Sequence, residues 1–243
     1  MNNIDVLLIP KEIVCKDKEL DDKLIVVIDV LRASSTIVTA LAQGCNGFIP
    51  IFSPDKARDK AKEFTKGEVL LGGERKGRKI EGFILGNSPR EYKKEIIKDK
   101  IIIFTTTNGV KTLEMAKNAS DIAICSFLNL KAICDYCLNF NGDVLVICAG
   151  EEGKFSLEDA VCAGMLIDSL RKKSPEFYRE TDANLTAQML YTQYADNILG
   201  MLKESQHGQY LESIGLGRDL EFCSSVDIFD IVPIFKDGMI IGR

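Results

Sequence analysis

The sequence has 243 residues, of which 46% are hydrophobic and 28% are charged, and its net charge at pH 7 is −5. This length suits one large domain or two smaller ones, and the composition is ordinary for a globular protein. The acidic balance argues against a nucleic-acid binder, and no apolar run reaches membrane-spanning length. The N-terminus does not show the pattern of a signal peptide, so we expect a cytoplasmic protein.

Apolar runs and polar, helix-forming segments alternate along the chain. The expected strands are 4–9, 24–30, 47–52, 68–71, 100–104, 122–125, 143–148, 224–229 and 232–236. The expected helices are 37–43, 55–65, 90–94, 110–117, 128–140, 157–172, 184–202 and 207–216. We expect Ser34, Ser35 or Thr36 to cap the first of these helices.

A unit of strand, short polar loop and helix occurs at residues 24–43, 100–117 and 143–172. Alternating units of this kind predict an α/β fold with three layers, α/β/α, around a largely parallel or mixed sheet. We expect residues 1–243 to form a single catalytic unit. The alternative is two similar α/β halves that divide near residues 120–140.

Ligands of such sheets collect beyond the carboxyl ends of the strands. The loops expected there are 29–36, 105–109 and 149–154, which carry carboxylates, hydroxyls and Arg32. Helix N-termini follow them and add free N–H groups. These loops predict a site for a multiply charged anion, with carboxylates able to hold a metal.

Residues 72–90 contain five glycines and an excess of cationic side chains over carboxylates. Apolar residues there follow neither the helical period of about 3.6 nor the strand period of about 2, so we expect a loop. The apolar residues within it argue against disorder. Arginine and lysine bind anionic oxygens, so we interpret the segment as an ordered anion-binding loop. The alternative is a solvated basic loop between two elements.

Several standard phosphate sites do not match. Residues 72–79 read GxxxxGRK without a helix start, Asp29 lacks a second carboxylate two residues on, and the residue six after Cys148 is lysine. His207 is the single histidine, a type that is more often structural than catalytic when alone. Metal-assisted chemistry remains, because Mg²⁺ needs one or two carboxylates and Asp29 ends a buried strand.

The eight cysteines lie mostly within apolar runs. Without an export signal, we expect reduced and mostly buried thiols. Cys134 and Cys137 form a lone CxxC on a predicted helix. A zinc or redox site there is a minor alternative, because structural zinc needs four ligands and no second CxxC or histidine pair is present.

Long segments at residues 29–41, 72–92, 105–113, 148–164 and 205–227 resemble the 2-phosphosulfolactate phosphatase family. The resemblance covers nearly the whole chain in order. It implies Mg²⁺-dependent hydrolysis of (2R)-phospho-3-sulfolactate to 3-sulfolactate and phosphate, an early step in making coenzyme M. It also implies a three-layer α/β fold and an oligomer, which we expect to be a homodimer. The substrate would be a small molecule with phosphate, sulfonate and carboxylate groups on three carbons, and neither nucleic acid nor membrane would be a partner.

For this reaction we expect Asp29 and Glu151 to be catalytic, and Asp29, Glu74 and Asp159 to hold Mg²⁺. The residues expected to bind the substrate are Arg32, Ser34, Ser35, Arg75, Arg78, Lys79, Asn87, Ser88, Arg90, Thr106, Thr107, Asn108 and Gly109. The alternatives are a non-catalytic binding protein for a phosphorylated or sulfonated metabolite, and a phosphatase for a related phospho-hydroxy acid.

Overall fold

The computed structural model of the chain describes residues 3–10, 20, 22–107, 112, 119–177 and 181–243. The expected helix at 110–117 therefore lies outside the described residues, apart from Thr112. The expected substrate ligands Asn108 and Gly109 and the cysteine at position 15 lie outside them as well.

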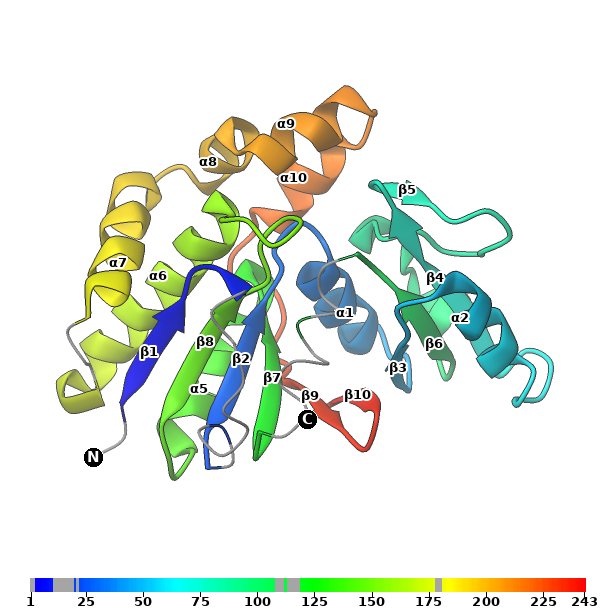
Figure 1. Cartoon of the computed structure of the whole chain (residues 1–243), viewed down its shortest axis with the longest axis horizontal. Coiled ribbons are helices and arrows are strands. Elements are labelled where there is room, and N and C mark those ends of the chain that lie inside the picture. Colours follow the sequence, from blue (N-terminus) through cyan, green and yellow to red (C-terminus); the bar gives the residue numbers. More distant parts are fainter. Residues whose placement is uncertain (1–2, 11–19, 21, 108–111, 113–118, 178–180) are drawn as a thin grey trace.

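The described strands form one mixed sheet (Figure 1). Its strands are β1 (Ile4–Leu7), β2 (Leu24–Ile28), β3 (Gly47–Pro50), β4 (Val69–Arg75), β5 (Arg78–Lys79), β6 (Ile101–Thr105), β7 (Asp121–Cys125), β8 (Val144–Cys148), β9 (Pro233–Lys236) and β10 (Met239–Gly242). Their order across the sheet is β1-β8-β2-β7-β9-β10-β3-β6-β4-β5.

Two parallel groups of strands make up most of this sheet. One contains β1, β8, β2 and β7, and the other contains β3, β6 and β4. The antiparallel hairpin of β9 and β10 stands between them and pairs with β7 on one side and β3 on the other. The expectation of an α/β fold with a largely parallel or mixed sheet is confirmed.

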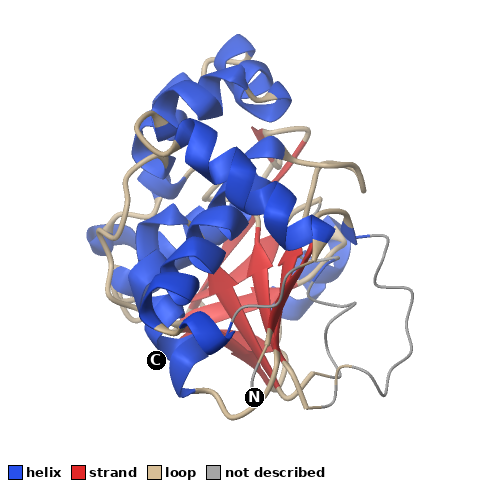
Figure 2. Cartoon of the chain, turned by 90° about the vertical axis from the view of Figure 1, so that its left-hand side faces the viewer, coloured by secondary structure: helices blue, strands red, loops and turns tan. Residues whose placement is uncertain are grey.

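Helices pack around the sheet, and Figure 2 shows them in blue beside and in front of the red strands. The helices are α1 (Ala33–Ala42), α2 (Pro54–Ala61), α3 (Lys94–Ile97), α5 (Leu130–Asn139), α6 (Leu157–Lys173), α7 (Asp182–Tyr194), α8 (Ile198–Glu204), α9 (Gln206–Ser213) and α10 (Gly217–Cys223), with short 3₁₀ turns η3 (Pro89–Glu91), η4 (Phe127–Asn129) and η5 (Pro175–Phe177).

Strand β2 shows why the sheet carries helices on both faces. All five of its residues are buried, and successive side chains of a strand point to opposite faces. Leu24, Val26 and Ile28 pack in a core cluster with α5 and α6. Ile25 and Val27 pack in a second cluster with α1. A continuous β-branched run is therefore the pattern of a strand buried on both sides.

Helix α1 lies between the two parallel groups of strands (Figure 1). Ile37 of this helix shares one core cluster with Ile124 of β7 and Phe104 of β6. Every residue of α1 from Ala33 to Leu41 is buried. The sheet therefore bends around α1, and strands from both groups end near the start of this helix.

The start of α1 differs from the expectation. The helix begins at Ala33 rather than at residue 37, its N-cap position is Arg32, and the side chain of Arg32 makes no capping hydrogen bond. The expected cap by Ser34, Ser35 or Thr36 is therefore wrong. Serine and threonine hydroxyls favour caps because they compete for backbone groups. Here the hydroxyl of Ser35 donates instead to the buried carbonyl of Val30, which precedes the helix.

Two expectations about the strands are also wrong: where β4 ends, and whether residues 224–229 form a strand. Residues 72–75 were expected to be loop, but they extend β4, which pairs with β6 as far as Thr105 and then turns into β5. Residues 224–229 were expected to be a strand. Instead, the N–H groups of Asp227 and Phe229 donate to carbonyls of η4, outside any sheet ladder.

Two of the expected helices are each replaced by two shorter ones. The segment expected as 184–202 divides into α7 and α8, because Asn197 accepts the N–H of Gly200 and starts a new helix. The segment 90–94 divides into η3 and α3, whereas the segment 207–216 corresponds to α9 alone and α10 follows it as a separate helix. These breaks turn the C-terminal region into a compact group of short helices above the sheet (Figure 1).

The seven described cysteines are all free and buried, as expected for reduced thiols. Cys134 and Cys137 lie within α5 in the core, so their spacing reflects one buried helix face. Burial raises the pKa of both thiols, which keeps them protonated and unreactive. Within the described residues, no helix combines the length and apolar character needed to cross a membrane.

Candidate active site

A pocket opens where the strands of both parallel groups end. Its volume is about 540 Å³ including the solvent at its mouth, which suits a small molecule. The residues that line it are Asp29, Leu31, Arg32, Glu74, Lys76, Gly77, Asn87, Thr106, Thr107, Glu151, Glu152, His207 and Tyr210. The loops after β2, β6 and β8 therefore meet here, as the βα pattern predicts, and helix α9 adds a further wall.

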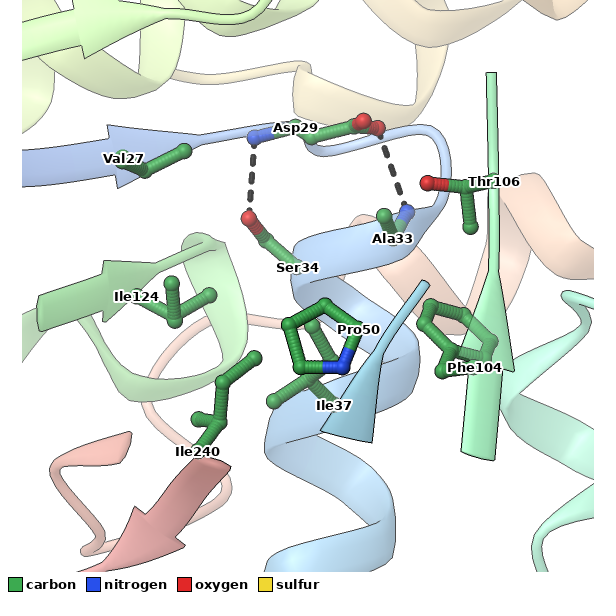
Figure 3. Close-up of a pocket in the computed structure, with 10 residues that line it drawn as sticks. All are labelled: Val27, Asp29, Ala33, Ser34, Ile37, Pro50, Phe104, Thr106, Ile124 and Ile240. Carbon is green, nitrogen blue, oxygen red and sulfur yellow. Dashed lines mark hydrogen bonds between the residues drawn. The ribbon is translucent and has the colours of Figure 1, made fainter. Parts of the chain in front are cut away.

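Asp29 follows β2 directly and is only 7% exposed. The N–H of Ala33 donates to Asp29 Oδ1 at 3.1 Å, and the N–H of Asp29 donates to Ser34 Oγ at 2.9 Å (Figure 3). Among the described residues, the second carboxylate oxygen of Asp29 has no hydrogen-bond partner. Asp29 therefore presents one free oxygen to the pocket.

A small cavity with a largely apolar lining adjoins Asp29 on the side of α1 (Figure 3). Apolar side chains around it come from Val27, Ile37, Phe104, Ile124 and Ile240. Because a charged carboxylate is poorly solvated in such surroundings, burial raises the pKa of Asp29 to about 6. The N–H of Ala33 and the positive charge of His207 oppose this increase.

Arg32 occupies the buried wall of the pocket and is 3% exposed. Its Nη1 donates to Asp219 Oδ2 at 2.7 Å, and its Nη2 donates to the carbonyl of Gly77 at 2.6 Å. Ser88 Oγ donates to the other oxygen of Asp219 at 2.6 Å. Helix α10, the β4–β5 turn and the loop before η3 therefore fix the guanidinium, which has five N–H donors in all.

Glu74 joins the β4–β5 turn to the loop after β6. Its Oε2 accepts the N–H of Gly77 at 2.8 Å, and its Oε1 accepts both the N–H and the hydroxyl of Thr107 at 3.0 Å. The carboxylate has about four acceptor sites, so these three bonds leave room for about one more ligand.

Glu151 and His207, which both line the pocket, form an ion pair with 2.9 Å between Glu151 Oε1 and His207 Nδ1. The hydrogen bond from His207 lowers the pKa of Glu151. Burial alone would lower the pKa of His207, but the bond and charge of Glu151, with Glu158 and Asp29 nearby, raise it above its usual value. Both shifts favour the charged form of each partner.

Asn87 is 6% exposed and lines the same pocket. Its Oδ1 is buried and has no hydrogen-bond partner in the described structure. A buried acceptor without a partner costs free energy, on the order of 1–3 kcal/mol. Because Asn87 belongs to the pocket lining, this acceptor is a candidate to be satisfied by a bound water, ion or ligand.

Asp159, expected to be a metal ligand, does not line the pocket. Its two oxygens accept the N–H groups of Val30 at 2.8 Å and Gly150 at 3.0 Å. Asp159 therefore ties together the loops after β2 and β8. Among the described residues, no group of three or more His, Cys, Asp or Glu side chains is arranged to hold a metal.

Comparisons with known proteins agree with this architecture over nearly the whole chain. The family model described as 2-phosphosulpholactate phosphatase matches residues 7–238. The chain belongs to this family. A probable 2-phosphosulfolactate phosphatase of Caldanaerobacter subterraneus is 41% identical, with 92% of each chain covered. Proteins with the same description from Clostridium tetani and Clostridium acetobutylicum are each 40% identical, with 98% of this chain and 99% of theirs covered.

The basic side chains expected to bind the substrate of this phosphatase family lie mostly away from the pocket. Arg75 donates to the carbonyl of Phe52 and stacks on its ring, 5.3 Å from the ring centroid. Arg78, Lys79 and Arg90 are exposed, and none of them lines the pocket. In a hairpin, successive side chains point to opposite faces, so one basic segment cannot aim all its cations at one ligand.

The expected serines also lie outside the pocket lining. Ser34 and Ser35 are buried within the first turn of α1, and Ser88 is bonded to Asp219. Their hydroxyls shape the walls through backbone and side-chain bonds. Thr106 and Thr107, by contrast, do line the pocket.

Lys76, His207, Tyr210 and Asp219 also lie at or beside this site, although they were not among the site residues expected from the sequence. Lys76 and Tyr210 line the pocket, and the hydroxyl of Tyr210 donates to the carbonyl of Lys76 at 3.0 Å. A signal existed for His207 and Asp219, since both lie in the C-terminal segment that carries the family resemblance. Nothing in their local pattern indicated which partner each would meet.

Proposed function

We propose that this chain is a phosphatase that hydrolyses 2-phosphosulfolactate to sulfolactate and phosphate. The observation that carries the proposal is the placement of a free carboxylate oxygen of Asp29 in one pocket with the buried guanidinium of Arg32. Metal-assisted hydrolysis of a phosphate ester can use a carboxylate that binds the metal, together with a fixed positive charge that stabilises the phosphoryl oxygens. The names of the relatives support the choice of substrate.

Arg32 is the residue that binds the phosphoryl oxygens. Partners among the described residues occupy two of its five N–H donors, which leaves donors for a ligand. Because Asp219 and Gly77 fix the guanidinium before the substrate arrives, little ordering is needed on binding. Thr106 lines the same pocket.

Glu151 and His207 line the same pocket as Arg32 and are suited to proton transfer. Hydrolysis breaks the bond between phosphorus and the ester oxygen, water supplies the new oxygen on phosphorus, and the departing oxygen takes up a proton. The ion pair can hold that proton or orient the water, because Glu151 accepts and His207 donates. The expected role of Glu151 as a catalytic residue is kept in this proposal.

We further propose Mg²⁺ as the cofactor, held by Asp29 and Glu74. The donor set fits, because Mg²⁺ prefers oxygen ligands and takes one or two carboxylates, with waters and substrate oxygens completing its shell. Asn87, which also lines the pocket, has a buried Oδ1 without a partner in the described structure and is a third oxygen donor near them. When bound, the ion polarises phosphoryl oxygens and offsets their negative charge.

The direct test is phosphate release from racemic phosphosulfolactate with Mg²⁺ and with EDTA. Phospholactate, which lacks the sulfonate, is the matched substrate. We expect release that requires Mg²⁺ and is faster with the sulfonated substrate. Release from neither substrate would contradict the proposal, and undiminished release in EDTA would contradict its Mg²⁺ component.

A homodimer in the cytoplasm remains part of the proposal. The resemblance to the family supports the dimer, and the free, buried cysteines suit a reducing compartment. The chain mass is 27.0 kDa, so sedimentation should give about twice that value. A monomeric mass at micromolar concentration would contradict the dimer.

A further inference from the structure

The three cations that line the pocket differ in how their charges are matched. Arg32 is paired with Asp219, and His207 is paired with Glu151. Lys76 has no hydrogen-bond or ion-pair partner for its ammonium group among the described residues. Of the three cations, Lys76 is therefore the one that lacks an ion-pair partner within the described part of the protein.

The backbone that carries Lys76 is held from three directions. The hydroxyl of Tyr210 donates to the carbonyl of Lys76, Arg32 donates to the carbonyl of Gly77, and the N–H of Gly77 donates to Glu74. Lys76 itself has a φ of +50°, a conformation that L residues adopt rarely. The turn is thus fixed against the pocket wall, although the lysine side chain is exposed.

Lys76 and Arg32 lie at different depths. Arg32 is almost completely buried, whereas Lys76 is exposed at the mouth. A ligand with two separated anionic groups would place one at each cation. The substrate of the proposed function has such groups, because its sulfonate stands on a methylene next to the carbon that bears the phosphate.

The sulfonate suits the outer position better than the carboxylate does. The carboxylate is attached directly to the phosphate-bearing carbon, and the sulfonate reaches one bond further from it. Lysine acts as a compact point charge, which matches the three equivalent oxygens of a sulfonate. Arginine has a planar fork that suits paired oxygens, and it occupies the inner position.

We propose that Lys76 binds the sulfonate of the substrate and thereby sets the preference for sulfonated over plain phospho-hydroxy acids. The inference rests on the proposed function and assigns its specificity to a single side chain. Within the basic hairpin of β4 and β5, the proposal assigns anion binding to Lys76 in the turn. Arg78 and Lys79 then lie outside the binding site.

The test compares kcat/KM for phosphosulfolactate and phospholactate in wild type and Lys76→Met. Methionine keeps the unbranched, apolar stem and removes only the charge. We expect kcat/KM for phosphosulfolactate to fall about 10–100-fold, chiefly through KM, because one hydrogen bond to a charged group is lost. For phospholactate the change should stay below about 3-fold, and Lys76→Arg should restore most of the preference.

Lys79→Met is the matched control, since Lys79 is an exposed lysine of the same hairpin outside the pocket lining. It should behave as wild type on both substrates. A Lys76→Met enzyme that keeps the wild-type preference, or that loses activity equally on both substrates, would overturn the assignment of Lys76 alone. A wild-type chain inactive on both substrates would overturn the proposed function and this assignment together.

Discussion

Asp29 combines burial with a free carboxylate oxygen, and this combination separates its effect on activity from its effect on stability. Asp29→Asn keeps the shape and removes the charge. We expect kcat to fall by roughly 10²–10⁴-fold, as for the loss of an essential acid, base or metal ligand. The free energy of unfolding should not decrease, because a poorly solvated charge is removed. Phosphate release and urea unfolding measure the two effects, and a parallel loss of both would contradict a role in the reaction.

The buried pair of Arg32 and Asp219 should contribute to stability as well as to the site. Asp219→Ala leaves a guanidinium buried without a counter-charge, which costs about 3–5 kcal/mol. Asp55→Ala is the matched control, since it breaks the surface pair with Arg58 and should cost less than about 1 kcal/mol. Urea unfolding of both variants gives the comparison. Equal costs would show that the buried pair is not a structural link.

The pair of Glu151 and His207 predicts a dependence of stability on pH. A raised pKa of His207 gives stability that is present below its ordinary value of 6.5 and is lost as pH rises through the raised value. A lowered pKa of Glu151 gives stability that is present above its ordinary value of 4.5 and is lost as pH falls through the lowered value.

The pH ranges in which His207 and Glu151 each contribute stability overlap in mildly acidic solution. We therefore expect the difference in Tm between wild type and His207→Gln to be larger at about pH 5.5 than at about pH 9. The measurement is thermal unfolding in EDTA, which removes any contribution from bound metal ions. An equal difference at both pH values would mean that the histidine contributes packing but no charge.

Residues that follow a strand directly were the predictable part of this site. Asp29, Arg32 and Glu151 could be inferred because the carboxyl ends of parallel strands converge. Lys76, His207 and Asp219 could not, since their position depends on packing between segments far apart in the sequence. A charged residue in a short helix has the same local pattern whether it faces solvent or a buried partner.

At the scale of elements, strand β4 depends on a close approach to β6. Gly73 has a φ of +144°, and a Cβ there would lie 2.1 Å from the carbonyl oxygen of Thr105. Gly73→Ala should therefore cost well over 1 kcal/mol, because backbone strain and a clash add together. Gly82→Ala is the matched control: its φ is +79° but nothing lies within 4 Å, so only the strain should appear. Urea unfolding compares them, and equal costs would contradict the clash.

The hairpin of β4 and β5 also shows why the basic, glycine-rich sequence of residues 72–90 predicts a loop although its first residues form a strand. Its apolar residues are few, so neither a helical nor a strand period is visible. Pairing with β6 and β5 supplies the backbone partners that the local sequence does not indicate. Helix α1 shows the reverse case, in which polar residues that normally favour turns lie inside a buried helix because backbone carbonyls satisfy their hydroxyls.

At the scale of the whole molecule, the alternation of strands and helices was sufficient to predict an α/β fold. It could not give the order of the strands. The last two strands, β9 and β10, lie in the middle of the sheet, and β10 was not expected at all. Insertion of a late hairpin between earlier strands is a long-range pairing, and short apolar runs do not specify their neighbours.

The position of that hairpin has a consequence for biosynthesis. During translation, β7 and β3 leave the ribosome long before β9 and β10, so each has an edge of unpaired N–H and C=O groups until the hairpin arrives. Such edges recruit other strands, including those of neighbouring nascent chains. The two groups of parallel strands must therefore wait, partly formed, for the segment that joins them, and premature release of the chain would leave an aggregation-prone product rather than a smaller working protein.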